Sequence, residues 1–479
     1  MSKFSVIAAL AGILCAGAVG YAQDSRPESS PTVLTLDQAV RIALSENLAV
    51  KVADKDIERA EYAKKGTYAA LFPQIDASAS YSRTIKKQVM YMDFDMGAFG
   101  GGGADAGDGT DPLEIATKAA GKASGSTAGG GIEVGRWNTY SAGVSAGLPI
   151  INAQLWKSLK ISGQDVELAV EKARSSRLET VTQVKQAFYG VLLAKEALNV
   201  YKEVYDNALE NFQQTEKRYN AEKASELEYQ RAKSTVQNAI PNVYDADNAV
   251  ALGLWQLKAV MGIDLDEDID VAGSLSDYSQ TMFRQLHEHD DVSLEDNSTM
   301  RQLAIQAEEL ANTIKLQQYA SLPTMALQFS YSLNAMTNDF KFSEYNWSPY
   351  SAVGVSLSIP IFAGGKRYNA VRQARNQYDQ FELTRENTER QLRVAIRQYL
   401  NQMETCMKNF DAAQSGVETA RKAYDIAART YNLGSSTVTE LNNAQLALTQ
   451  AQLASSQAIY NFVVAKSNLE QMLGNDFSE

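Results

Sequence analysis

The sequence is poor in the residues from which metal centres and disulfide frameworks are built. Its 479 residues include only 2 Cys, 2 His and 9 Pro. A His/Cys metal site or a set of disulfides has little material to draw on, so we expect no metal and no cofactor. Acidic residues outnumber basic ones, 57 against 45, and the net charge is −12. Such a chain is not expected to bind nucleic acid, because phosphate binding needs clustered basic charge.

Long uncharged apolar runs are also missing after the first residues, so no transmembrane helix is expected. The first residues themselves resemble an export signal. Lys3 precedes an apolar run over 7–18, and Gly20 and Ala22 are small residues suited to cleavage. We therefore expect a signal peptide over 1–22. An exported chain without an apolar helix can cross a membrane only as a β-barrel.

The two halves of the chain repeat one plan. A shift of 250 residues superposes the openings of the halves, and a shift of 212 superposes their later parts. Matched pairs are Asn47 and Asn297, Glu58 and Glu308, Tyr81 and Tyr331, Tyr219 and Tyr431, and Glu228 and Glu440. We expect a first repeat over 23–270, a linker over 271–292 and a second repeat over 293–479. The first repeat carries a Gly-rich insert at 97–131, expected to be an exterior loop because it cannot bury a core.

Each repeat contains two runs that alternate between apolar and small polar residues. The expected strands span about 74–92, 137–150, 323–337 and 348–361. Each span contains an alternating run of about 10 residues, enough for a tilted strand to cross a bilayer, and the two faces of that run suit a wall between lipid and water. The alternation fits an ordinary antiparallel sheet with one wet face equally well.

The later part of each repeat predicts two very long helices. Apolar residues recur with alternating spacings of four and three over 184–219 and 392–431, which is typical of a coiled coil. We expect helix pairs over 152–262 and 362–474, each reversed by a short turn. A further helix opens each repeat, and the first begins with a capping box formed by Thr35 and Gln38.

Few residues indicate chemistry, and none is expected to make the chain an enzyme. The stretch Gly143–Gly147 matches the G-x-S-x-G motif around Ser145, but that motif needs a strand-to-helix turn and here lies inside a strand. Other candidate ligands lie in loops, where solvated side chains are the favoured interpretation over metal binding; they are His287, His289, Asp105, Asp108 and Asp111.

Several motifs together resemble the TolC-type outer-membrane efflux family. They are Leu34–Leu44, the strand-ending 148–150 and 359–362, and the spacing Tyr431-x-x-Gly434-x-x-Thr437-x-x-Glu440-x-x-Asn443. The resemblance implies an α+β membrane protein: a homotrimeric twelve-stranded β-barrel, with four strands per chain, continued by a long α-helical tunnel. It also implies an outer-membrane location extending into the periplasm, contact with outer-membrane lipid, and partners in a periplasmic adaptor and an inner-membrane pump.

The number of predicted strands also indicates that several chains are needed, because four strands cannot close a barrel and open sheet edges are forbidden in lipid. The expected function is therefore a passive exit duct for a tripartite efflux or type I secretion system. Two alternatives stay open from the sequence. One is a secreted coiled-coil scaffold or adhesin without a pore, and the other is a secreted hydrolase that uses Ser145.

The resemblance also implies roles for residues near the two helix turns. In that family an acidic pair past the second turn rings the closed periplasmic end, and a Tyr at this turn is linked across neighbouring helices. The implied gate residues are Glu228, Tyr431, Glu440 and Asn443, where Asn443 replaces the second acid. The implied adaptor-docking tips are Ala221, Glu222, Lys223, Leu433, Gly434 and Ser435. On residue type alone, Glu228 and Glu440 are helix-start carboxylates that favour the positive end of the helix dipole.

Overall fold

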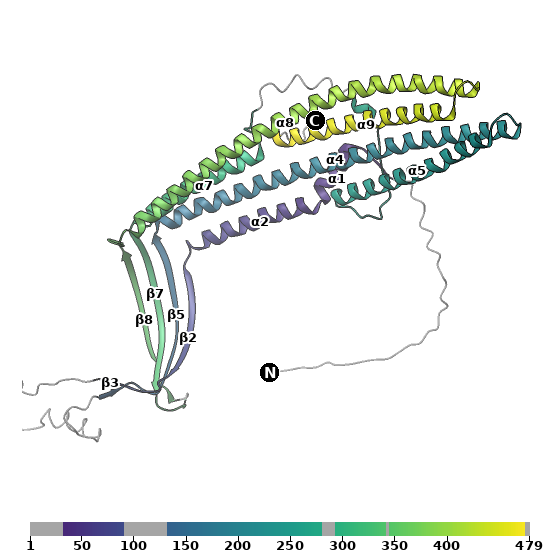
Figure 1. Cartoon of the computed structure of the whole chain (residues 1–479). Helices are drawn as coiled ribbons and strands as arrows, with labels where there is room; N and C mark the ends of the chain where they lie inside the picture. The colour runs from purple at the N-terminus through teal and green to yellow at the C-terminus, as the bar shows by residue number, and fades with distance from the viewer. Residues whose placement is uncertain (1–31, 91–131, 280–292, 342–343, 475–479) are drawn as a thin grey trace, which may run out of the picture. The chain divides into compact units, whose positions relative to one another are not determined.

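A computed structural model describes residues 32–90, 132–279, 293–341 and 344–474 (Figure 1). The chain divides into two compact units, and both take segments from the two halves of the sequence. Among the described residues, those within 54–172 and 299–389 form the sheet unit, and those within 32–53, 173–298 and 390–474 form the helical unit. The expected signal peptide (1–22) and the Gly-rich insert (97–131) lie outside the described residues.

The sheet unit is built on one antiparallel sheet of four strands in the order β2-β5-β7-β8. The strands are β2 (Gln74–Arg83), β5 (Asn138–Ile151), β7 (Thr324–Thr337) and β8 (Ser348–Ser358). The four predicted strands are present, but the first and the last end earlier than predicted. Beyond Arg83 the chain forms a separate short ladder of β3 (Gln88–Met90) with β4 (Ile132–Val134).

The register of the sheet brings the apolar residues of all four strands onto one face. Val144 lies opposite Ala77 on one side and Tyr331 on the other, and Phe329 lies opposite Val353. The small polar residues share the other face, where the hydroxyls of Ser80 and Ser141 are 2.7 Å apart. Apolar side chains such as Ile75 and Val353 are about 70% exposed in the single chain. The two predicted faces are therefore continuous across the sheet.

Four helical segments connect to the strands within the sheet unit. They belong to α2 (Leu48–Ala69), α4 (Ala153–Asn220), α7 (Ser298–Tyr319) and α8 (Lys366–Asn432). Each strand runs directly into or out of one of these helices, so the helices follow the order of the strands (Figure 1). No helix in the described ranges combines the length and the apolar composition needed to cross a bilayer.

The helical unit pairs the rest of α4 with α5 (Glu226–Met261) and the rest of α8 with α9 (Val438–Leu473). Beside them lie α1 (Leu36–Glu46), the short 3-10 helix η2 (Leu275–Tyr278), and β1 (Thr32–Leu34) paired in parallel with β6 (Ile269–Val271). Side chains from both repeats fill one core; among them are Phe188, Val191, Leu257, Met261, Met403, Cys406, Phe462 and Leu469. Cys406 is 2% exposed, as its place in the predicted heptad seam requires.

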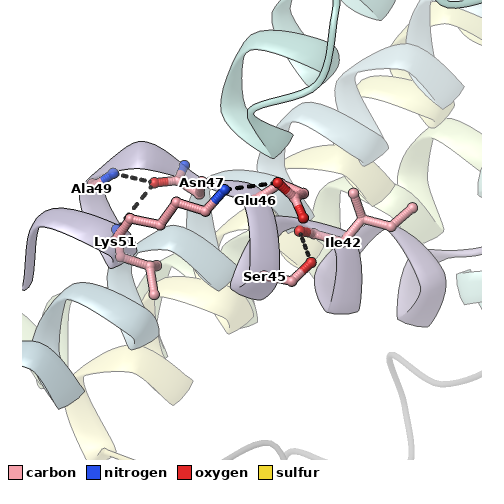
Figure 2. Close-up of polar contacts among 7 residues, drawn as sticks. Ile42, Ser45, Glu46, Asn47, Ala49 and Lys51 are labelled. Atoms are coloured by element: carbon pink, nitrogen blue, oxygen red, sulfur yellow. Dashed lines mark hydrogen bonds and ion pairs between the residues drawn. The ribbon is translucent and has the colours of Figure 1, made fainter. Parts of the chain in front are cut away.

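The predicted opening helix of the first repeat is broken in two at Asn47. The side-chain oxygen of Asn47 accepts from the Ala49 N–H at 2.7 Å and from the Val50 N–H at 3.3 Å, so Asn47 caps α2 (Figure 2). Its side-chain amide donates to the carbonyl of Val260, at the end of α5, at 2.6 Å. One polar side chain thus starts one helix and satisfies the last turn of another.

The same contact recurs in the second repeat. The Asn297 amide donates to the Met472 carbonyl near the end of α9, also at 2.6 Å. Gly262 and Gly474 follow the two long helices in the left-handed conformation, with φ of 78° and 70°. A Cβ at either glycine would collide with the backbone oxygen of the residue before the corresponding Asn. Glycine is therefore required at both positions for conformation and for space.

We predict that Asn47→Ala lowers the free energy of unfolding by about 2 kcal/mol, because it removes a helix cap and leaves the Val260 carbonyl without its donor. Ser45→Ala is the matched control. The Ser45 hydroxyl donates only to the Ile42 carbonyl of its own exposed helix turn, at 2.9 Å (Figure 2), so its loss should change stability by less than about 0.5 kcal/mol. Denaturant unfolding of the detergent-solubilised protein measures both, and equal effects would contradict the role given to Asn47.

Candidate functional site

The two turns that join the long helices have the same backbone geometry. In each, two N–H groups past the helix end donate back to its last carbonyls: Lys223 to Arg218 at 2.7 Å, Glu222 to Tyr219 at 2.9 Å, Ser435 to Thr430 at 2.9 Å and Gly434 to Tyr431 at 2.9 Å. This is the Schellman arrangement, which places one residue in the left-handed region. Gly434 adopts φ 74°, as predicted for the reversal, and Glu222 adopts φ 60° despite its side chain.

The two predicted gate carboxylates each cap the helix that follows their turn. Glu228 accepts from the Ser225 N–H at 3.1 Å, and Glu440 accepts from the Thr437 N–H at 3.4 Å. The Ser225 and Thr437 hydroxyls accept in return from the Glu228 and Glu440 N–H groups. Within one chain both acids therefore serve the helix starts, which is the simpler of the two interpretations drawn from the sequence.

Within one chain, the Tyr431 hydroxyl forms a hydrogen bond with Thr215 of the other repeat and not with Glu228. Its hydroxyl lies 2.7 Å from the hydroxyl oxygen of Thr215 on α4. The Thr215 hydroxyl also lies 2.8 Å from the Asn211 carbonyl, which can only accept. The Thr215 proton is therefore committed to Asn211, and Tyr431 donates to Thr215. The exposed fractions are 3% for Tyr431 and 1% for Thr215, so water does not compete for this bond.

Arg218 strengthens the same connection. Its guanidinium carbon is 5.7 Å from the centroid of the Tyr431 ring, within the range of a cation–π contact. Around Tyr431 pack Val438 and Leu441 of α9, with Tyr424 of α8 at the edge. Burial raises the pKa of the Tyr424 hydroxyl, and the neighbouring acids Glu210 and Glu203 raise it further. The surroundings of Tyr431 are thus apolar on one side and cationic on the other.

The two repeats differ at this position. Tyr219, the counterpart of Tyr431, stacks on Tyr229 with ring centroids 5.0 Å apart and remains 37% exposed. The residue that corresponds to Thr215 in the second repeat is Ala427, which has no hydroxyl to offer. Within one chain the structure therefore makes the Tyr–Thr link once.

The remaining predicted residues occupy the surface of the turns. Asn443 is exposed, and its neighbour Asn442 donates instead to the Thr235 hydroxyl of α5 at 3.2 Å. All six predicted docking residues lie in or beside the turns and are exposed, and Leu433 reaches 80%. Thr215, Arg218 and Asn442 are not among the site residues predicted from the sequence. The one available signal was Thr215, a hydroxyl among apolar residues in the predicted heptad seam.

The other candidates from the sequence do not form a site in the described part of the chain. Ser145 lies in the middle of β5, opposite Asp76 and Ser330, so it lacks the strand-to-helix turn of a nucleophile. Among the described residues, no group of three or more His, Cys, Asp or Glu side chains is placed so that it could hold a metal ion. His287, His289 and the three aspartates of the Gly-rich insert lie outside them.

Comparison with known proteins adds three relatives. Alkaline protease secretion protein AprF of Pseudomonas aeruginosa is 22% identical over 294 residues, which is 59% of this chain and 59% of that protein. The Campylobacter jejuni CmeC outer membrane channel shares the fold at a TM-score of 0.65 and 17% identity, covering 97% of this chain and 94% of that one. The open state of the Neisseria gonorrhoeae MtrE outer membrane channel has a TM-score of 0.66 and 17% identity, covering 92% and 88%.

The family assignment rests on the sequence itself. The family described as "Outer membrane efflux protein" matches residues 103–263 and 291–475, well over half of the chain. This match confirms the resemblance drawn from the motifs, and with it the location in the outer membrane with an extension into the periplasm. The chain belongs to the outer membrane efflux protein family.

Proposed function

We propose that three copies of this chain form a passive exit duct through the outer membrane, in which a twelve-stranded barrel continues into a tunnel of α-helices. The observation that carries the proposal is the four-stranded sheet, which has a continuous apolar face, a polar face and two unpaired edge strands. The apolar face suits lipid and the polar face suits an aqueous pore. The repeated contacts of Asn47 and Asn297 support an origin of the chain by internal duplication.

The edge strands require more than one copy. In lipid the backbone groups of β2 and β8 need partners, and four strands are too few to close a barrel. Pairing β8 of one copy with β2 of the next satisfies both edges, and three copies supply the twelve strands implied by the family resemblance. The similar fold of the CmeC and MtrE channels supports this arrangement.

The gate lies at the two turns. In each copy the bond from Tyr431 to Thr215 ties the second helix pair to the first, and the three copies together hold the tunnel end closed. Glu440, repeated around the threefold axis, forms a ring of carboxylates that concentrates cations. Glu228 and Asn443 lie beside this ring.

The exposed turns are the part that a periplasmic adaptor reaches, and an inner-membrane pump supplies the energy. Ala221, Glu222 and Lys223 form one docking tip, and Leu433, Gly434 and Ser435 form the other. The family name points to efflux and the name of AprF points to secretion of an alkaline protease, so the cargo class is either small molecules or a secreted protein. Both uses need the same passive duct.

We predict that the purified protein is a trimer and conducts ions in planar bilayers. The currents should be small because the gate is closed at rest, and they should favour cations because carboxylates ring the constriction. Electrophoresis without heating measures the trimer, and reversal potentials in a salt gradient measure the selectivity. A monomer that never conducts would contradict the proposed function.

We predict that Tyr431→Phe raises the resting conductance, because it removes one net hydrogen bond of about 1 kcal/mol per copy. Thr215→Val removes the same bond from the other side, so the double variant should conduct little more than either single variant. Tyr424→Phe is the matched control, since it removes a neighbouring hydroxyl that makes no bond to Thr215. Conductance unchanged in both single variants would mean that helix packing alone closes the tunnel.

We predict that Gly434→Val abolishes export while trimers still form. A branched side chain at φ 74° strains the turn by about 1–2 kcal/mol, and the space itself is open, because the nearest atom is Arg218 Nη2 at 3.8 Å. Glu222→Gly relieves the same strain in the other turn and should preserve export. The readout is drug or dye susceptibility, or secretion, in a deletion strain carrying each variant. Full export by Gly434→Val would show that this turn tolerates distortion.

A further inference from the structure

The two repeats meet in the sheet unit along a seam between α4 and α7. Lys160 forms an ion pair with Glu308 at 2.9 Å, and one turn further the Asn312 amide donates to the Gln164 oxygen at 2.7 Å. Gln164 and Asn312 are each only 3% exposed. The seam therefore joins a charged pair at its surface to a buried amide pair beneath it.

The same relation between repeats predicts a second seam. The shift of 212 residues carries α4 onto α8, so Lys160 corresponds to Arg372 and Gln164 to Asn376. The shift of 250 residues relates α7 to α2, so Glu308 corresponds to Glu58 and Asn312 to Tyr62. The charges of the ion pair keep their signs, and the buried amide pair becomes an amide and a phenol that can also hydrogen-bond.

The second seam cannot form inside one chain. The strand order β2-β5-β7-β8 puts α4 and α7 behind adjacent strands, but it puts α2 and α8 behind the two opposite edges. Tyr62 is 68% exposed, and Asn376, Arg372 and Glu58 are exposed as well. Asn376 and Tyr62 are thus uncovered in the single chain although their counterparts Gln164 and Asn312 are buried, while Arg372 and Glu58 lie at the surface as Lys160 and Glu308 do.

We infer that α8 of one copy packs on α2 of the next as a replica of the internal α4–α7 seam, with Arg372 paired to Glu58 and Asn376 beside Tyr62. The inference rests on the proposed assembly and adds to it the residues that fix the register between copies. The occupant of each exposed face is the other exposed face of a second copy, which brings Arg372 of one face opposite Glu58 of the other.

Two like-charge contacts of the internal seam have no equivalent in the replica. In the internal seam, burial raises the pKa of Glu309 and the nearby Asp165 raises it further; the corresponding residues are Arg59 and Gln377. Burial lowers the pKa of Lys157 and the nearby Lys315 lowers it further; the corresponding residues are Asn369 and Lys65. Both like-charge contacts are absent from the replica, so it carries the ion pair without either repulsion.

Glu58 and Arg372 each already make one contact within the chain. Glu58 already accepts from Lys55 on its own helix at 2.8 Å, and Arg372 lies over the ring of Tyr368 at 5.4 Å. A carboxylate has room for both cations, and no carboxylate of the described residues lies within ion-pair distance of Arg372. The inter-copy pair therefore adds to the existing contacts and displaces neither.

Cysteine cross-linking tests the seam in the full-length protein. In a Cys406→Ala background, Tyr62→Cys combined with Asn376→Cys should give covalent dimers and trimers on oxidation. The matched control combines Asn376→Cys with Lys64→Cys, which lies about 200° around α2 from position 62. Gln164→Cys with Asn312→Cys should cross-link within one chain and give no covalent dimers or trimers. The inference would be overturned if trimers conduct but the Tyr62→Cys, Asn376→Cys variant gives no covalent dimers and trimers, or if the Lys64→Cys control gives as many. Either result would leave the proposed channel function standing.

Charge reversal tests the ion pair. Glu58→Arg and Arg372→Glu should each lower the temperature at which the unheated trimer dissociates, and the two changes together should restore most of the loss. Glu61→Arg is the matched control, because it reverses a charge on the same helix without a partner in the replica seam. Equal losses for the single and double variants would overturn the pairing. If the unmodified protein forms no trimers and does not conduct, the result would count against the proposed function and not against this pairing.

Discussion

The unpaired edges of the four-stranded sheet are the constraint on which the rest of the structure depends. Each edge strand carries a row of backbone N–H and C=O groups that water can satisfy but lipid cannot. A sheet whose apolar face meets lipid must therefore find partners for β2 and β8 outside its own chain. Because each strand continues into a helix, the helices inherit the same unpaired edges, and α2 and α8 are left exposed where α4 and α7 are packed.

The two halves of the sequence follow one plan, and the contacts at the candidate site differ where the halves diverge. The turns share their backbone, their capping boxes and a Tyr at the same position. Of these two tyrosines, Tyr431 lies within hydrogen-bond distance of the Thr215 hydroxyl. The residue that corresponds to Thr215 in the second half is Ala427, which has no hydroxyl to offer Tyr219. One substitution in a seam thus converts a structural turn into a link between the helix pairs.

Local patterns in the sequence determined most of the fold. Alternation located all four strands, Gly434 located a reversal, and Thr35 with Gln38 marked the start of α1, where the structure has the expected capping box. The break at Asn47 and the parallel pair of β1 with β6 were missed. Both depend on contacts between residues more than 200 positions apart, as in the bond from Asn47 to Val260, and no local pattern reports such a partner.

The seam positions of the residues near the two turns were predictable from the sequence, but their contacts were not. Heptad spacing identified Tyr431 and Thr215 as seam residues, but it does not say which of the neighbouring helices each side chain faces. Glu228 is the more obvious partner for a Tyr hydroxyl because its carboxylate is charged. That carboxylate is instead held by the Ser225 N–H, since a helix start with its unpaired donors is the nearest site that a carboxylate can satisfy.

The difference between a charged and a neutral partner changes how the proposed gate opens. Three neutral hydroxyl bonds contribute together about 1.5–4.5 kcal/mol to the closed state, where charge-assisted bonds would contribute about 5–9 kcal/mol. Since 1.36 kcal/mol corresponds to a tenfold change in an equilibrium, the neutral links favour closure by about ten- to two-thousand-fold. An adaptor opens such a gate if it binds the open turns more tightly by the same few kcal/mol.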